Sequence, residues 1–388
     1  MSKSMFVFSG MESVPTNVTC VTVKYGVTEI PKNAFKNRRE LTSIHIPDTV
    51  TTISSGAFLG CASLVYVHIP SSVKEIGAFA FEDCSSLVTI HFPSTITKIG
   101  SGAFKKCTSL ISIELPSSMT KIEYRTFFKC KSLISVCLPS SISEICERAF
   151  DKCSSLISIQ QQQQRQHPQS SVVKGSEESL RSDDFLLSEH LSSLTRIYDH
   201  AFFDCKSLIS IHLPSSMKYI GDGVFCGCSS LRSITLPSRI DYNDNSDVTF
   251  PLDEVFNGCK SVERIMIESS VTHVQTEVVY IMYGVVVENP ILAKTPCTAD
   301  SCLALHVLLK FGYTYFLPGA IDEIVEVSSS SLSLCDPIHN MFPFLLAACT
   351  PRQKNRNLPS LETIFVLLRE APWVMETLIL NFKDSSSL

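Results

Sequence analysis

Hydrophobic residues recur along this chain at a fixed spacing. An Ala-Phe pair, or a Thr-Phe or Val-Phe variant, occurs nine times, ending at Phe35, Phe58, Phe81, Phe104, Phe127, Phe150, Phe202, Phe225 and Phe256. The first five steps are 23 residues each. A repeat of about 20 to 29 residues predicts a solenoid, in which each repeat forms one coil and stacked coils share a continuous core.

Each repeat predicts two strands and a turn. Residues 67–69 (Val-His-Ile) alternate apolar, polar and apolar, as in a strand with one buried face. Pro70 then ends the strand, because proline has no N–H to donate to a neighbouring strand. We expect a second short strand at residues 73–76. We also expect one helical turn at residues 80–84, with Phe81 pointing into the core.

Two insertions interrupt the period. Between Phe150 and Phe202 lie two periods plus six residues, and the excess contains a glutamine-rich segment, residues 160–184. This segment is predicted to be disordered, because its apolar content is too low to offset the entropy cost of ordering it. Between Phe225 and Phe256 lies one period plus eight residues, which includes residues 241–247.

The second insertion resembles the start of a calcium-binding loop. Asp241, Asn243 and Asn245 have the spacing that opens an EF-hand loop. However, Ser246 stands where that loop needs Gly, and Leu252 stands where it needs Glu. The segment is therefore predicted to be a solvated turn.

The regular period ends after Val274. The apolar run 278–287 is too short for a transmembrane helix, which needs about 20 residues, so we expect it to cap the open end of the core. Helical patterns follow at residues 302–312, 320–327, 342–349 and 361–375, and residues 336–349 with the helix from Leu361 resemble an ankyrin-type helix pair. The predicted domains are a flexible N-terminus (1–17), a solenoid (18–275) and a small all-α helical-hairpin domain (276–388).

The complete repeat, LxxIxLPSSVxxIxxxAFxxC, is similar to the BspA-like leucine-rich repeat family. Good matches lie at residues 64–84, 87–107 and 208–228. The resemblance implies an α/β solenoid, a leucine-rich repeat array with parallel strands on its concave face. Bacterial members of the family are surface adhesins, and roles elsewhere are mostly unassigned.

Composition argues against several partners. The chain has 388 residues and a formal net charge of −5, without a concentrated Lys/Arg stripe, so nucleic acid and anionic membrane are not expected as partners. No stretch is apolar for the roughly 18 residues of a membrane span. The N-terminal apolar run is too short for a signal peptide, so we expect a cytoplasmic protein.

Cysteines follow the repeat. Eight of the 16 cysteines share one offset: Cys61, Cys84, Cys107, Cys130, Cys153, Cys205, Cys228 and Cys259. No CxxC pair occurs, so a zinc site is not expected, and these residues are predicted to be buried thiols. A disulfide framework is the alternative, and it would require secretion, as would use of the glycosylation sequon at Asn17.

Candidate binding residues lie at outward strand positions. His45, His68 and His91 share one strand offset in three successive coils, on strands about 4.8 Å apart. A flat ladder of imidazoles does not converge on a tetrahedral metal site, so a binding surface is the preferred interpretation. The candidate partner-binding residues of the concave face are His45, Tyr66, His68, His91, Glu114, His212 and Arg264.

Nothing in the sequence indicates an active site. Residues 221–227 imitate a glycine-rich nucleotide loop, but their glycines fall at ordinary turn positions of the repeat. We therefore expect no enzymatic activity, no cofactor and no metal. The predicted function is recognition or scaffolding of a protein partner by the concave face.

Two alternatives remain beside this prediction. One is an adhesion or recognition protein at the cell surface or outside the cell. The other is an enzyme whose site lies in the C-terminal helical region. That region carries Asp322, Glu323, Glu326 and His339, at spacings that match no known catalytic constellation.

Overall fold

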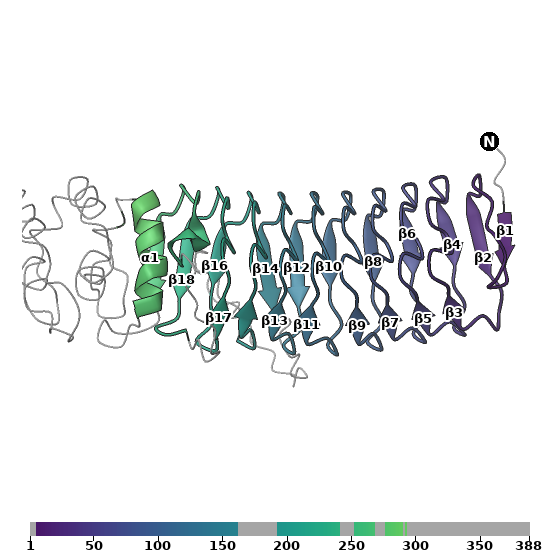
Figure 1. Ribbon diagram of the computed structural model, residues 1–388, viewed down its shortest axis with the longest axis horizontal. Coiled ribbons are helices and arrows are strands. Elements are labelled where there is room, and N and C mark those ends of the chain that lie inside the picture. Colours follow the sequence, from purple (N-terminus) through teal and green to yellow (C-terminus); the bar gives the residue numbers. More distant parts are fainter. Residues whose placement is uncertain (1–4, 162–191, 241–251, 268–275, 290–291, 293–388) are drawn as a thin grey trace, which may run out of the picture. The chain divides into compact units, whose positions relative to one another are not determined.

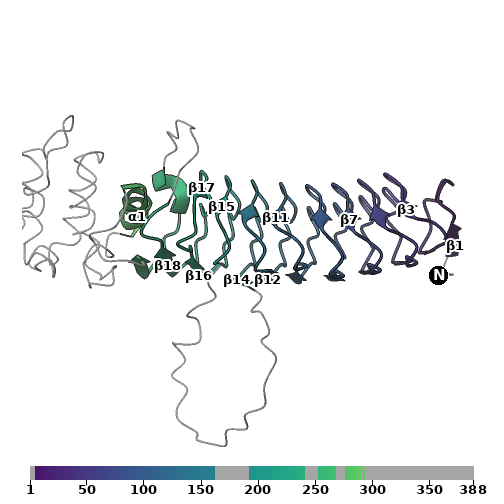
Figure 2. The same ribbon diagram turned by 90° about the horizontal axis from the view of Figure 1, so that it is seen from below.

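The computed structural model describes residues 5–161, 192–240, 252–267, 276–289 and 292. The chain divides into two compact units. The first contains residues 1–145 and 156–194, and the second contains residues 146–155 and 195–388. In each unit the chain winds into a parallel-strand solenoid, with a long strand on one face and a short strand on the opposite face (Figures 1 and 2).

The long strands of the first unit lie in register one repeat apart. Val67 pairs with Ile90, and His68 with His91, because a 23-residue step returns the chain to the same offset. The strands form three parallel groups, β1-β2-β4, β6-β8 and β10-β12-β14. Their bounds are β1 Met5–Phe8, β2 Cys20–Val23, β4 Ser43–His45, β6 Tyr66–His68, β8 Thr89–His91, β10 Ser112–Glu114, β12 Ser135–Leu138 and β14 Ser158–Gln161.

The predicted second strand of each repeat is confirmed. Short two-residue strands pair in parallel with one another, for example through Ile53 and Ile76. Each buries its isoleucine and leaves its first residue at the surface. In the first unit they are β3 Glu29–Ile30, β5 Thr52–Ile53, β7 Glu75–Ile76, β9 Lys98–Ile99, β11 Lys121–Ile122 and β13 Glu144–Ile145.

The second unit repeats this plan and ends in a helix. Its short strands are β15 Arg196–Ile197 and β17 Tyr219–Ile220, and its long strands are β16 Ser210–His212, β18 Ser233–Leu236 and β19 Arg264–Ile267. A 3-10 helix, η1 Leu252–Phe256, precedes β19, and helix α1 Thr276–Glu288 packs against η1.

Helix α1 confirms the predicted cap of the last coil. Its side chains Val278, Ile281, Met282, Val285 and Val286 are buried. Just beyond the helix, the Nδ2 of Asn289 donates a hydrogen bond to the carbonyl oxygen of Cys259 at 2.8 Å.

A ladder of stacked phenylalanines forms the centre of each core. In the first unit, the Phe81 ring lies 5.0 Å from Phe58 and 5.3 Å from Phe104, and the planes are within 10° of parallel. In the second unit, Phe202 stacks on Phe150 at 5.2 Å and on Phe225 at 5.4 Å. These rings are fully buried, so the predicted inward direction of the phenylalanines is confirmed.

The predicted helical turn at the Ala-Phe step is wrong. The N–H groups of Phe58 and Gly60 donate to Ala80 and Glu82 of the next coil, each at 2.7 Å, instead of to a residue four positions earlier. Residues such as Phe79 and Asp83 adopt left-handed backbone angles, with φ of 57° and 62°, which interrupts any helix. The segment is a run of tight turns, and its backbone adds a third hydrogen-bonded ladder between coils.

Several predicted segments differ from the structure or lie outside it. Residues 5–8, predicted to be flexible, form β1, which pairs with β2 and buries Phe8. Gln160 and Gln161, predicted to be disordered, belong to β14 and pair with Cys137 and Leu138. The rest of the glutamine-rich segment, residues 241–247 and the ankyrin-like region from residue 293 lie outside the described residues.

Candidate functional site

The long strands of the first unit carry two outward rows of side chains. One row contains Tyr66 and its equivalents, and the other contains His68 and its equivalents, two residues further along each strand. The inward residue between them is always a branched aliphatic, as at Val67, Ile90 and Val136. The outward residue of the second row is histidine in three successive coils and differs in the others: Thr22, His45, His68, His91, Glu114, Cys137 and Gln160.

A shallow groove of about 470 Å³ lies over β8, β10 and β12. His91 and Glu114, two of the predicted site residues, line it together with Phe92 and Ser94. Both His91 and Glu114 are exposed at strand ends, so their polar atoms can meet a ligand without movement of the backbone. We name this depression the strand groove.

Phe92 gives the strand groove an aromatic wall. Its ring packs edge-on against Phe104, with centroids 5.6 Å apart and planes at 66°. Other coils place a buried aliphatic side chain at this offset, as at Ile69 and Leu115, whereas Phe92 remains partly exposed. Phe92 was not predicted as a site residue, although an aromatic residue at an otherwise aliphatic offset is visible in the sequence.

The structure brings some predicted residues together and separates others. Tyr66, 45% exposed, and His68 lie on β6 beside Thr89 and His91 of β8. His45 lies on β4 in the same unit. His212 and Arg264 belong to the second unit, and they stand in different rows, because β18 pairs His212 with Thr235 but Arg264 with Ser233.

A third outward row was missed by sequence reasoning. Directly after the core leucine of each coil stands a branched aliphatic residue: Val65, Val88, Ile111, Ile134 and Ile157. Val65 is 48% exposed, Ile111 and Ile134 are each 44% exposed, and Val88 is partly exposed. Their backbones are linked from coil to coil by hydrogen bonds of 2.7–3.1 Å. We name this row the aliphatic stripe; the repeated Leu-Val or Leu-Ile dipeptide was its signal in the sequence.

The structure also shows a local group of cations, which the overall composition of the chain does not indicate. Lys106, Arg125 and Lys129 occupy the turns of two neighbouring coils, and the Arg125 guanidinium lies 4.8 Å from the Tyr124 ring and 5.3 Å from the Phe128 ring. Within the part of the chain that the structure describes, none of the three forms an ion pair. The stacking on aromatic rings stabilises Arg125 in place of a carboxylate.

The repeated cysteines are structural. Buried thiols donate to the carbonyl oxygen of the phenylalanine one coil earlier, as from Cys61 to Phe35 at 3.1 Å and from Cys107 to Phe81 at 3.2 Å. Burial raises the pKa of Cys61 to about 12 and that of Cys84 and Cys107 well above the ordinary value. Thiols held protonated in this way are poor nucleophiles and poor metal ligands.

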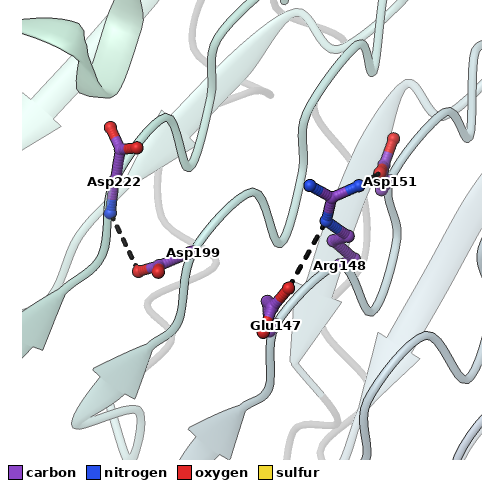
Figure 3. Close-up of polar contacts among 5 residues, drawn as sticks. All are labelled: Glu147, Arg148, Asp151, Asp199 and Asp222. Atoms are coloured by element: carbon purple, nitrogen blue, oxygen red, sulfur yellow. Dashed lines mark hydrogen bonds and ion pairs between the residues drawn. The ribbon is translucent and has the colours of Figure 1, made fainter.

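Polar contacts at the turns of the second unit serve the fold (Figure 3). Arg148 lies between Glu147, at 3.4 Å, and Asp151, at 3.8 Å. Asp199 accepts the backbone N–H of Asp222 at 3.0 Å. The hydroxyl of Tyr219 also donates to Asp199, and burial, with the Asp199 charge second, raises the pKa of Tyr219 to about 12. Among the described residues, no group of three or more His, Cys, Asp or Glu side chains could hold a metal ion.

The glycine-rich segment 221–227 is part of the repeat turn. Gly223 and Gly227 have φ of 53° and 78°, and the equivalent residues one coil earlier, His200 and Asp204, adopt the same left-handed region. At Gly221, a Cβ atom would lie 2.2 Å from the Asp199 carboxylate oxygen, so only glycine fits beside it. The spacing of these glycines therefore follows from coil packing.

Helices give no indication of a membrane span. Across the described residues, none is both long and apolar enough to cross a bilayer.

Solved structures similar to this chain include leucine-rich repeat proteins of T. pallidum and Bacteroides ovatus. The T. pallidum protein is 23% identical, with a TM-score of 0.41, over 59% of this chain and 83% of that one. The Bacteroides ovatus protein is 25% identical, with a TM-score of 0.36, over 65% of this chain and 72% of that one.

A third similar structure is a leucine-rich cell surface protein of Faecalibacterium prausnitzii. It is 24% identical, with a TM-score of 0.34, over 66% of this chain and 75% of that one. No curated protein matches the chain.

The family comparison covers more than half of the chain. The model of the BspA type leucine rich repeat region matches residues 28–157 and 185–282. These ranges contain the strands from β3 to β13 and from β15 to β19, the stacked phenylalanines from Phe35 to Phe256 and the first part of the capping helix. The chain therefore belongs to the BspA-type leucine-rich repeat family.

Proposed function

We propose that this chain is a non-enzymatic recognition protein that binds a protein partner through the outward face of its long strands, centred on the strand groove. Leucine-rich repeat proteins typically bind other proteins. The observation that carries the proposal is the groove of about 470 Å³, in which His91, Glu114 and Phe92 present three different chemistries on neighbouring strands.

The contrast between inward and outward positions supports this function. The offset of the core leucine holds the same residue from coil to coil, because the core requires it, as at Leu64, Leu87 and Leu110. The His68 row instead changes among hydroxyl, imidazole, carboxylate, thiol and amide side chains. Since the scaffold does not fix these side chains, they are free to determine which partner is bound.

The shape of the site favours a protein over a small molecule. Small-molecule sites are enclosed and mostly apolar. The strand groove is an open depression whose exposed His91 and Glu114 lie on strands tied by backbone hydrogen bonds. A partner that docks on such a preformed surface orders few protein groups, which lowers the entropic cost of binding. A partly exposed aromatic beside charged or polar groups is also a common arrangement at binding hot spots.

The test compares two double variants of the full chain. Partners captured by the wild type from native lysate are identified, and their affinity for purified His91→Ala/Glu114→Ala protein is then measured by calorimetry. We expect at least a tenfold loss of affinity. The matched control is Glu75→Ala/Lys98→Ala, which changes two exposed residues that pair on the short-strand face of neighbouring coils.

Equal affinity of the wild type and the His91→Ala/Glu114→Ala variant would contradict recognition by the strand groove. A loss of the same size in the control would also contradict it, because the effect would then not belong to the long-strand face. Thermal unfolding of all three proteins is compared first, so that a binding loss is not read from an unfolded variant.

We further propose that the chain acts in the cytoplasm as a recognition or scaffold protein. The buried, protonated thiols at Cys61, Cys84 and Cys107 are compatible with a reducing compartment. The alternative is recognition at the cell surface, where BspA-like proteins often occur. Protease added to intact cells distinguishes the two locations, because it reaches only proteins on the outer surface. Cleavage of this protein under those conditions would contradict the cytoplasmic assignment. A glycan on the exposed Asn17 would also contradict it.

A further inference from the structure

The aliphatic stripe is a continuous apolar feature on the surface of the first unit. Its exposed fractions are 48% at Val65, 44% at Ile111 and Ile134, and 40% at Ile157, with Val88 partly exposed between them. Hydrogen bonds join each residue to its neighbour one coil away. At about 4.8 Å per coil the stripe is roughly 19 Å long.

The fold does not require aliphatic residues at this offset. Two earlier coils of the same unit place Thr19 and Thr42 there, and each continues into a regular long strand, β2 and β4. Single exposed hydrophobic residues are ordinary on protein surfaces, whereas contiguous apolar rows are often functional. Coil packing therefore does not account for the aliphatic residues of the stripe.

The rows that flank the stripe carry no charge. On one side lie Ser63, Ser86, Ser109 and Ser132, and on the other lie Tyr66, Thr89, Ser112, Ser135 and Ser158. The exposed Lys131 directly precedes Ser132 in the sequence and lies outside both rows. A partner that covers the stripe must itself be uncharged and aliphatic there, because a charge facing this surface would lose its hydration without gaining a counterion.

We propose that the stripe is the contact surface of a symmetric dimer, with a second copy of this chain as the partner. Two copies related by a twofold axis would run antiparallel, with Ile111 on the axis against Ile111 of the partner subunit. Val88 would then face the partner's Ile134, and Val65 the partner's Ile157. Such an interface is self-complementary, since the same surface serves on both subunits.

The spacing of the coils favours a second copy over another kind of partner. Two stripes with the same repeat remain in register along their whole length. An α-helix rises about 5.4 Å per turn, so over four steps of about 4.8 Å it would drift by roughly 2.4 Å. Two stripes with their small flanking side chains would bury less than about 1,200 Å² of surface in total, which is at the low end for protein interfaces. The dimer is therefore expected to be weak and to depend on concentration.

Sedimentation velocity of the full chain over a concentration series tests the proposal. The wild type is expected to dimerise reversibly in the micromolar range. Ile111→Lys and Ile111→Glu should each weaken dimerisation at least tenfold, because each sets like charges against each other across the axis. An equimolar mixture of the two should restore a dimer, now with opposite charges facing each other.

Control variants separate the stripe from general surface hydrophobicity. Val7→Lys and Tyr25→Lys introduce the same charge at residues that are 59% and 79% exposed and lie outside the stripe, and they should leave the dimer unchanged. A wild type that stays monomeric at all concentrations would overturn the proposal. So would a dimer that Ile111→Lys does not weaken or that the controls weaken equally, or a mixture of the two Ile111 variants that remains monomeric.

The dimer and the recognition function are tested by different measurements. The strand groove adjoins the stripe, because Thr89, Ser112 and Ser135 line the groove and also flank the stripe. The residues changed in the recognition test, His91 and Glu114, lie three residues further along each strand than Val88 and Ile111, roughly 10 Å away. His91→Ala/Glu114→Ala protein is therefore expected to dimerise like the wild type in sedimentation, whatever its affinity for a protein partner in calorimetry.

Discussion

The thiol of Cys84 donates a hydrogen bond to the carbonyl oxygen of Phe58, 3.2 Å away in the preceding coil. The ring of Phe58 stacks on Phe81, three residues before the cysteine. Each cysteine thus forms a hydrogen bond with the backbone of the preceding coil, at the residue whose ring stacks on the phenylalanine of the cysteine's own coil. The same contact recurs from Cys107 to Phe81 and from Cys130 to Phe104, so proton loss from these thiols acts on several coils at once.

Stability should fall at alkaline pH because of these thiols. Burial raises the pKa of Cys61 to about 12 and that of Cys84 and Cys107 well above the ordinary value, whereas an unfolded thiol titrates near about 8.5. Below the unfolded pKa both states hold the proton and the contribution is complete. Above it only the unfolded state ionises, so each thiol costs about 1.4 kcal/mol of unfolding free energy per pH unit until the folded pKa is reached.

Urea unfolding at pH 7 to 11 measures this dependence. Cys84→Ala/Cys107→Ala should reduce the slope of unfolding free energy against pH above about 9, although it lowers stability at pH 7. Ile90→Ala is the control, because it removes buried volume without a titrating proton and should lower stability equally at every pH. An unchanged slope in the cysteine variant would show that these thiols do not set the alkaline limit.

Truncation of a ladder phenylalanine should be far more damaging than truncation of its exposed neighbour. Phe81 is fully buried between Phe58 and Phe104, so Phe81→Ala is expected to cost about 3–5 kcal/mol. Phe79, two residues earlier, is 37% exposed, and Phe79→Ala should cost less than about 1 kcal/mol. Chemical unfolding followed by circular dichroism compares them, and similar losses would contradict the inward ladder as the main source of stability.

Gly102 tests the ladder of left-handed turns. Its φ is +62°, and a Cβ atom there would lie 2.5 Å from the Phe79 ring of the preceding coil. Gly102→Ala should therefore cost about 1–2 kcal/mol for the backbone, plus the cost of moving the ring. In a Phe79→Ala background only the backbone part should remain, so the two changes should be less destabilising together than the sum of their separate effects.

A second glycine provides the matched comparison for Gly102. At Gly223, with φ of +53°, the nearest atom to an added Cβ is the His200 Nε2 at 3.3 Å. Gly223→Ala should thus cost less than Gly102→Ala. Strict additivity of Gly102→Ala and Phe79→Ala in unfolding measurements would contradict the predicted contact between coils.

The capping helix depends on Asn289. Its Nδ2 donates to the carbonyl oxygens of Cys259 at 2.8 Å and of Val285 at 3.1 Å, and the side chain is buried. Asn289→Ala leaves the Cys259 carbonyl without this donor, which should cost about 1–3 kcal/mol. Hydrogen exchange of the amides in α1 should accelerate, whereas the control Glu288→Ala, at a partly exposed position, should leave it unchanged. Unaltered exchange in Asn289→Ala would contradict this role.

Strands and core could be predicted because their signals repeat. At Val67 and Ile90 the alternation of apolar and polar residues, followed by proline at Pro70 and Pro93, specifies both the strand and its end. The apolar run 278–287 was correctly assigned as a cap, since apolar residues after the last repeat have only the open core to cover. One step of 23 residues then fixes the register of every pair.

The third hydrogen-bonded ladder, formed by the tight turns, could not be predicted in the same way. Left-handed backbone at Phe79, Lys106 and Arg125 has no signature in residue type, because glycine occupies the equivalent positions only in some coils. Its geometry comes from N–H groups that bond to the neighbouring coil, which is a tertiary effect. The sequence pattern of Ala-Phe-x-x-Cys is equally compatible with a helical turn when that neighbour is not considered.

The binding surface was predicted in part for a related reason. His68 and His91 could be placed side by side by counting residues, and β6 and β8 pair them as predicted. Tyr66 and Arg264 were predicted to lie near the histidine row, and β18 pairs Arg264 with Ser233, two residues before Thr235 of that row. The aliphatic stripe was missed because its residues follow the core leucine directly and resemble part of the core in a hydrophobicity pattern.

The three backbone ladders that join neighbouring coils all repeat after the same number of residues. Loss of one whole repeat, such as residues 88–110, would bring Phe81 against Phe127 and Val65 against Ile111 with every ladder intact, and duplication of it would insert one further coil in the same register. A deletion of a single residue would instead misplace the strands and the turn together. Changes of length in such a gene are therefore tolerated in whole repeats, and each one lengthens or shortens the outward face without any change to the core.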